Sequence, residues 1–209
     1  MPRDAAITET LVAWGVAGRP LPGQTVSGDL HLVKPVSDGV LLAVVDGLGH
    51  GELATAASKT ALEVLERQAG DRLSSLVLHC HAALAGTRGV VMTLTALSSS
   101  GGQLTWMGVG NVEGVLLRGN RPAGTSPERV LLRGGIVGYR LPELQTKTLA
   151  LASGDLLVFV TDGIRSGFSN DLDHGDTPQR LADRILERYF KGTDDALVLV
   201  VRYVGPEHE

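Results

Sequence analysis

The sequence predicts an α+β protein in which two antiparallel β-sheets pack together with helices on the outside. Three observations lead to this prediction. Most apolar segments are short and separated by turn residues, whereas helical periodicity is confined to a few places. The 209 residues include 27 glycines, which suits many tight turns. Hydrophobic residues make up 43% of the chain, which is ordinary for a globular domain with a real core.

The first part of the chain is expected to form three strands and then two helices. Apolar alternation and short apolar runs predict strands over Ile7–Val16, Leu30–Val33 and Gly39–Val45, the last of them buried. After a glycine-rich turn the apolar residues change to helical spacing, which predicts a helix over Glu52–Gln68. A second helical pattern begins at Asp71.

The rest of the chain returns to short strands before one more helix. Turn residues separate the apolar segments, and Thr177 followed by Pro178 marks a helix start. A helix with the apolar stripe Leu181, Ile185 and Tyr189 is therefore expected there. The expected strands are Val90–Leu97, Gln103–Gly108, Val112–Leu117, Arg129–Arg133, Gln145–Leu149, Leu156–Thr161 and Ala196–Val204.

The composition argues against several classes of protein. Nineteen basic and 23 acidic residues give a net charge of −4, and no polybasic run is present, so no nucleic-acid partner is expected. No apolar stretch is long enough to span a membrane, and no secretory leader is recognisable. Cys80 is the only cysteine, which excludes an intramolecular disulfide and fits a reducing compartment. We therefore expect a cytoplasmic protein without a membrane association.

Four aspartates share one local context, because each lies at the start or end of an expected strand, beside glycine or another acid. They are Asp29, Asp46, Asp162 and Asp194. Carboxylates that converge without cysteines or a histidine cluster suit a hard cation such as Mg²⁺ or Mn²⁺. Any one of these aspartates alone could simply serve a turn. The four together leave a carboxylate metal site and a set of turn residues as the two alternatives.

Other nucleotide and hydrolase motifs fail to match. The glycines after Asp46 are spaced Gly-x-Gly-x-Gly rather than as in a dinucleotide-binding turn. Neither a P-loop nor the G-x-S-x-G elbow of serine hydrolases occurs. Asp46-Gly47-Leu48 also lacks the Asp-x-Asp that haloacid dehalogenase-type phosphatases require.

Taken in order, the aspartate motifs resemble those of PPM-type metal-dependent serine/threonine phosphatases, in the bacterial SpoIIE-like branch of sporulation and stress-response enzymes. The resemblance extends from about Ser27 to Val201. It implies the α-β-β-α sandwich of that family, with four layers and the metals at one edge of the paired sheets. The matching segments are Ser27-Gly28-Asp29, Val45 to Gly51, Gly154-Asp155, Val160 to Ile164, and Asp194-Asp195.

The resemblance also implies a site and a reaction. Two Mn²⁺ or Mg²⁺ ions would be held by carboxylates and one main-chain carbonyl, and a water that they activate would attack phosphorus in line. His50 is a possible donor or general acid, or else a helix-start residue, and Asp195 could exchange roles with its neighbour. The implied metal ligands are Asp29, Asp46, the carbonyl of Gly47, Asp162 and Asp194.

The stretch Gly108–Gly114 and three single residues lie outside this implied set of ligands. The stretch Gly108–Gly114 departs from the Gly-Asp-Ser-Arg pattern of the family, so it is assigned no additional ligand. Arg165 and Ser166 either reach the substrate or solvate their loop. Asp155, which opens a strand after a turn, is expected to be structural.

The short chain resembles the stand-alone stressosome phosphatases of the family. Residues 1–209 are expected to form a single catalytic domain without an appended sensor domain, and to act as a monomer. Phosphorylated STAS-domain stressosome scaffold proteins are the implied partners, recognised by loops around Thr125–Pro127 and Gly167–Pro178. The alternative is a non-catalytic phosphatase-like module that binds a phosphoprotein or a STAS-domain partner.

Overall fold

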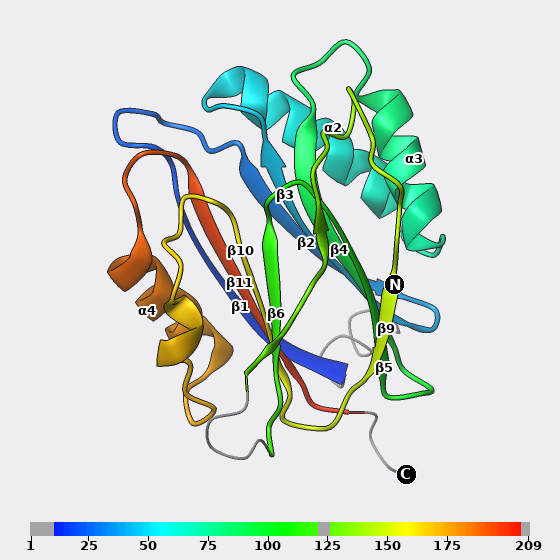
Figure 1. Ribbon diagram of the computed structural model, residues 1–209, viewed down its shortest axis with the longest axis vertical. Coiled ribbons are helices and arrows are strands. Elements are labelled where there is room, and N and C mark those ends of the chain that lie inside the picture. Colours follow the sequence, from blue (N-terminus) through cyan, green and yellow to red (C-terminus); the bar gives the residue numbers. More distant parts are fainter. Residues whose placement is uncertain (1–10, 121–125, 206–209) are drawn as a thin grey trace.

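Two β-sheets pack face to face in the computed structural model, which describes residues 11–120 and 126–205 (Figure 1). One sheet has the strand order β1-β11-β10-β6-β7 and the other β2-β3-β4-β5-β8, with β9 paired to β5. The helices α2 and α3 cover the outer face of the second sheet, and α4 covers the outer face of the first. The expected four-layer α-β-β-α sandwich is confirmed.

The elements follow one another along the chain in the predicted order. All pairs of neighbouring strands are antiparallel except β5 and β8, which pair in parallel over two residues. The bounds are β1 Val12–Arg19, β2 Asp29–Val36, β3 Gly39–Gly47, α2 Glu52–Arg67, α3 Leu73–Ala83, β4 Val90–Ser98, β5 Gln103–Val109, β6 Glu113–Leu117, β7 Glu128–Arg129, β8 Leu132–Arg133, β9 Lys147–Ala150, β10 Leu156–Val160, a 3-10 turn Phe168–Asp171, α4 Pro178–Tyr189 and β11 Ala196–Tyr203.

Most of these elements lie within a few residues of the predicted bounds, but two predictions need correction. The first strand runs over Val12–Arg19 rather than Ile7–Val16, and the beginning of the expected range lies outside the described residues. The strand expected over Arg129–Arg133 is two short pieces. Its first piece pairs with β6 in one sheet and its second with β5 in the other, so the chain crosses between sheets there.

Three apolar layers hold the sandwich together, and β3 contributes to two of them. Its residues Leu41, Ala43 and Val45 face α2 and α3, whereas Val40, Leu42 and Val44 face the other sheet. Side chains alternate between the two faces of a strand, so a strand covered on both faces is apolar throughout. Burial on both faces explains why the apolar run of β3 is continuous up to Val45, directly before Asp46. A third layer lies between α4 and the outer face of its sheet.

Candidate metal centre

Asp29 and Asp46 stand opposite each other on neighbouring strands. Asp29 is the first residue of β2, and its Cα is paired with that of Asp46 near the end of β3. Directly opposite residues of an antiparallel pair have Cβ atoms about 5 Å apart. The hydroxyl of Thr161 donates a 2.7 Å hydrogen bond to Asp29, and itself accepts one from the amide of Leu197. The sheet that contains β10 therefore helps to orient a carboxylate of the sheet that contains β2.

Asp162 and Asp194 come from the facing sheet, where β10 ends and β11 begins. Because these strands are antiparallel neighbours, the two aspartates lie at the same edge of the sheet. Gly163 allows the strand ends to approach closely, since a Cβ built there would lie 1.9 Å from the carbonyl oxygen of Asp195. In the Asp-Gly sequence at this strand end, the aspartate is a candidate ligand and the glycine is required for steric reasons.

The structure distinguishes Asp194 from Asp195, which the sequence leaves interchangeable. Both carboxylate oxygens of Asp195 accept main-chain hydrogen bonds, from Leu21 at 2.7 Å and from Gly28 at 2.6 Å, and only 2% of Asp195 is exposed. Asp195 therefore ties the loop before β2 to the start of β11. Asp194 is instead partly exposed and lines the cleft between the sheets.

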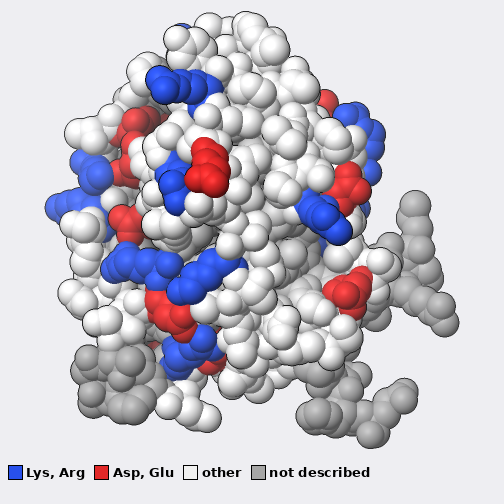
Figure 2. Space-filling view, turned by 45° about the vertical axis from the view of Figure 1, so that its right-hand side comes forward, with Lys and Arg blue, Asp and Glu red and all other residues white. Residues whose placement is uncertain are grey.

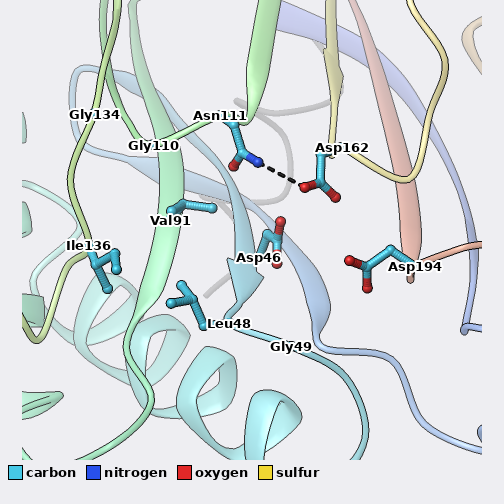
Figure 3. Close-up of a pocket in the computed structure, with 10 residues that line it drawn as sticks. All are labelled: Asp46, Leu48, Gly49, Val91, Gly110, Asn111, Gly134, Ile136, Asp162 and Asp194. Carbon is cyan, nitrogen blue, oxygen red and sulfur yellow. Dashed lines mark hydrogen bonds between the residues drawn. The ribbon is translucent and has the colours of Figure 1, made fainter.

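Carboxylates and apolar side chains face one another across this cleft (Figure 3). Asp46, Asp162 and Asp194 point toward a common space of about 370 Å³. Asp29, which is paired with Asp46 on the neighbouring strand, is only 5% exposed. The amide of Asn111 donates a 2.8 Å hydrogen bond to Asp162. The opposite wall is formed by Leu48, Val91 and Ile136.

The pKa values of three aspartates are raised, because these carboxyl groups are removed from water and lie close to one another. Burial, together with the charges of the neighbouring aspartates, raises the pKa of Asp29 to about 7, although the hydrogen bond from Thr161 opposes the shift. Burial and the same neighbours raise the pKa of Asp46 to about 9. The pKa of Asp194 is also raised, chiefly by burial. Converging carboxylates with no nearby cation disfavour one another's charge.

The donor set fits divalent cations. Among the described residues, no Lys, Arg or His forms an ion pair with any of the five aspartates. Nor do three His, Cys, Asp or Glu side chains in the described part of the chain gather closely enough to enclose one ion. Water would then complete each coordination sphere, as Mg²⁺ usually requires. The residues present suit ions that are held by a few carboxylates each.

The glycine-rich turn after β3 brings His50 to the edge of this cleft. Gly49 and Gly51 have φ values of 84° and 76°, which glycine adopts without strain. His50 is exposed, and it lies near enough to Asp194 to favour the ionised carboxylate. Gly51 forms the N-cap of α2, so the helix-start interpretation of His50 is wrong by one residue.

Sequence reasoning did not identify three residues that the structure brings to the site. Asn111 belongs to a stretch noted only for departing from a family pattern, Thr161 precedes a candidate ligand, and the Nζ of Lys191 donates to the carbonyl of Asp162. Their neighbours in the sequence could have drawn attention to Thr161 but not to the other two. Asn111 and Lys191 reach Asp162 from loops 51 and 29 residues away.

Comparison with known proteins identifies the family. The family described as Stage II sporulation protein E (SpoIIE) matches residues 37–204. The chain therefore belongs to the SpoIIE family. None of the helices among the described residues is long and apolar enough to cross a membrane.

Individual relatives agree with this assignment. The chain is 25% identical over 180 residues to the phosphoserine phosphatase RsbX of Bacillus subtilis (strain 168), covering 86% of this chain and 88% of RsbX. A solved structure described as "The bacterial stressosome: a modular system that has been adapted to control secondary messenger signaling" matches this chain with a TM-score of 0.83. That match has 31% identity and covers 91% of this chain and 99% of the other. RsbX in complex with magnesium matches in fold with a TM-score of 0.81, 22% identity and coverage of 92% and 96%.

Proposed function

We propose that the protein is a single-domain phosphoprotein phosphatase that requires two Mn²⁺ or Mg²⁺ ions. Their ligands would be Asp29, Asp46, the carbonyl of Gly47, Asp162 and Asp194. The observation that carries the proposal is the convergence of four aspartates from both sheets, none of which forms an ion pair with a described Lys, Arg or His. Burial and the neighbouring carboxylates together raise the pKa values of Asp29 and Asp46. Divalent ions would remove that repulsion.

The chemistry divides between the ions and the chain. When bound, the ions supply an activated water and neutralise charge on the phosphoryl oxygens. Thr161 and Asn111 hold the carboxylates of Asp29 and Asp162 in fixed orientations, and such outer hydrogen bonds tune a ligand's direction and basicity. Asp195 anchors the loop that leads into Asp29 and is not a ligand in this proposal. His50, exposed at the rim, is available to transfer a proton to the leaving group.

The proposed substrates are phosphorylated STAS-domain scaffold proteins of a stressosome, in the cytoplasm. Two observations support this choice. The relative RsbX is a phosphoserine phosphatase, and a stressosome-related structure covers nearly the same length of chain at 31% identity. The cleft is open to solvent beside exposed loops, which suits a phosphorylated residue on the surface of a folded protein. The enzyme would act on them as a monomer.

Hydrolysis of para-nitrophenyl phosphate tests the proposal directly. The purified protein is assayed with Mn²⁺, with Mg²⁺ and with a chelator, beside Asp46→Ala and the distant control Asp38→Ala. Turnover that needs a divalent ion, persists in the control and vanishes in Asp46→Ala is the expected result. Full metal-dependent turnover by Asp46→Ala would contradict it.

Phosphoprotein substrates and calorimetric titration with Mn²⁺ complete the experiment. Two ions per chain are expected in the titration. Metal binding without hydrolysis of either the small or the protein substrate would instead favour the non-catalytic module that binds a phosphoprotein.

A further inference from the structure

A second hollow of about 430 Å³ lies beside the metal cleft and shares two of its residues, Asn111 and Asp162. The part that is not shared is lined mainly by the loop after β10 and the loop before β11. Its remaining lining residues are Glu113, Thr161, Ile164, Arg165, Ser166 and Lys191. A substrate whose phosphate enters the metal cleft would therefore place a neighbouring residue in this second hollow, which we call the flank pocket.

The flank pocket carries positive charge that the described residues do not compensate. The carboxylate of Glu113 is paired with Arg129 at 2.8 Å, and Asp162 belongs to the metal cleft. Arg165 and Lys191 form no ion pair within the described part of the chain. On the face drawn in Figure 2, basic and acidic side chains lie beside one another. The flank pocket is therefore suited to an anion.

Main-chain contacts hold both cations in place before any ligand arrives. The amide of Arg165 donates to the carbonyl of Tyr189 at 2.8 Å, and its guanidinium donates to the carbonyl of Arg188 at 2.6 Å. The amide of Lys191 donates to Gly163, and its ammonium donates to the carbonyl of Asp162. These acceptors are neutral, so the hydrogen bonds fix the side chains without cancelling their charge.

The remaining donors match a carboxylate. A guanidinium has five N–H groups in a planar fork and an ammonium has three, and the guanidinium fork can bind a carboxylate with two parallel hydrogen bonds. Fixing donors in advance lowers the entropy lost when a ligand binds. An extended peptide advances about 3.3 Å per residue, so the bound side chain belongs to a residue within about three positions of the phosphorylated one.

We propose that the flank pocket binds the acidic side chain of an Asp or Glu close to the phosphoserine or phosphothreonine of the substrate protein. This inference rests on the proposed phosphatase function and adds a rule of site selection to it. Arg165 is a specificity-determining residue in this scheme, and Lys191 assists it from the other side of the pocket.

Synthetic phosphoserine peptides test the inference. In one neutral sequence a single Asp is moved through positions −3 to +3 around the phosphoserine, and each peptide is compared with its Asn counterpart. A charge-assisted hydrogen bond at an exposed site corresponds to about a tenfold effect. We therefore expect kcat/KM to rise about tenfold for Asp at one or two adjacent positions, mainly through KM. The preference should weaken in higher salt, because exposed charges are screened.

Variants then assign the preference to the pocket. In Arg165→Gln the Asp preference should fall below about threefold, whereas Arg165→Lys should keep part of it, since lysine retains the charge but not the fork. Hydrolysis of para-nitrophenyl phosphate, which has no flanking carboxylate, should stay within about twofold of the unmodified enzyme. Arg67→Gln, at an exposed position near the end of α2, is the matched control and should keep the full preference.

The outcomes separate the two proposals. Peptide hydrolysis without an Asp preference, or a preference that survives in Arg165→Gln and in the Arg165→Gln/Lys191→Gln double variant, overturns the flank pocket but leaves the phosphatase intact. An equal loss on para-nitrophenyl phosphate in Arg165→Gln also overturns it, because the arginine would then act on the phosphate itself. Absence of hydrolysis of every substrate with either metal overturns the phosphatase and the pocket together.

Discussion

Strand β10 has a buried aspartate, Asp155, just before it and a partly exposed one, Asp162, just after it, and the two have different surroundings. Asp155, before the strand, is 1% exposed and accepts hydrogen bonds from Arg118 at 2.9 Å and from the amides of Gly119 and Ala152. Asp162, after the strand, faces Asp46 and Asp194 across the cleft, and Asn111 is the side chain that donates to it. At one end of the sandwich a cation forms an ion pair with the carboxylate, whereas at the other end no described residue does.

This difference indicates which acids serve the fold and which serve the chemistry. A buried carboxylate that has a cation and main-chain donors is satisfied by the protein itself, as expected of a structural residue. A group of carboxylates without cations keeps an unfavourable electrostatic energy that a bound metal relieves.

The largest effect is expected from Asp46→Asn. Loss of this proposed ligand should lower metal-dependent turnover by about a thousandfold or more, because metal ions contribute several kcal/mol to the stabilisation of the transition state. Without metal, the thermal unfolding temperature at pH 8 should stay the same or rise, since the substitution removes a carboxyl group whose raised pKa favours the unfolded state at that pH. Turnover and calorimetric unfolding measure the two effects. A large loss of stability in the metal-free variant would place Asp46 among the structural acids.

Asp155→Asn should give the reverse pattern. The uncharged amide of asparagine cannot neutralise Arg118, and its NH₂ group would face main-chain N–H groups that are themselves donors. We therefore expect a loss of about 2 to 4 kcal/mol in the free energy of unfolding. Turnover per folded molecule should remain within about twofold, because the residue lies at the far end of β10 from the cleft. Urea unfolding and an activity assay below the transition measure both. A strong loss of turnover by well-folded enzyme would contradict the division of roles.

Two adjacent residues at the site itself also differ in role, one as a proposed ligand and the other as a structural acid. Asp194→Asn should weaken Mn²⁺ binding about tenfold or more, with little change in metal-free stability, as expected for a ligand. Asp195→Asn should instead lower metal-free stability by about 1 to 3 kcal/mol, because Leu21 and Gly28 both donate to its carboxylate. Titration calorimetry and thermal unfolding distinguish them. If the two variants behaved alike, the assignment of separate roles would be wrong.

The crowded carboxylates should also make the stability of the metal-free protein depend on pH. The pKa values of Asp29 and Asp46, about 7 and about 9, exceed the value of 3.8 for an unperturbed aspartate. The native state therefore retains protons that the unfolded state has already released. Since stability falls with pH wherever the native state binds more protons, these two groups should destabilise the protein progressively between about pH 4 and pH 9.

Thermal unfolding at pH 5, 7 and 9 in a chelator measures this trend. The fall should be shallower in Asp46→Asn, which cannot ionise at that position, and in the presence of Mg²⁺, which binds the ionised carboxylates. The same fall in the variant as in the unmodified protein would show that other groups cause it.

Several features of the molecule could be predicted from the sequence because they depend on local patterns. The continuous apolar run over Gly39–Val45 indicated a buried strand, and β3 is one. The change from strand to helical spacing after Gly51 located α2 closely. The expectation that Asp155 is structural agrees with its contacts to Arg118 and the main chain. By contrast, β7 and β8 could not be told apart from a single strand over Arg129–Arg133, because two residues are too few to show any periodicity.

The sequence by itself determined the order of strands and helices, the family to which it belongs and the positions of the aspartates at strand ends, since these follow from periodicity and from short motifs. Only the tertiary structure decided the different surroundings of Asp194 and Asp195 and the approach of Asn111, Arg165 and Lys191 to one another around Asp162. The direction and partners of a side chain in a loop depend on segments far away in the sequence, and no local pattern records them.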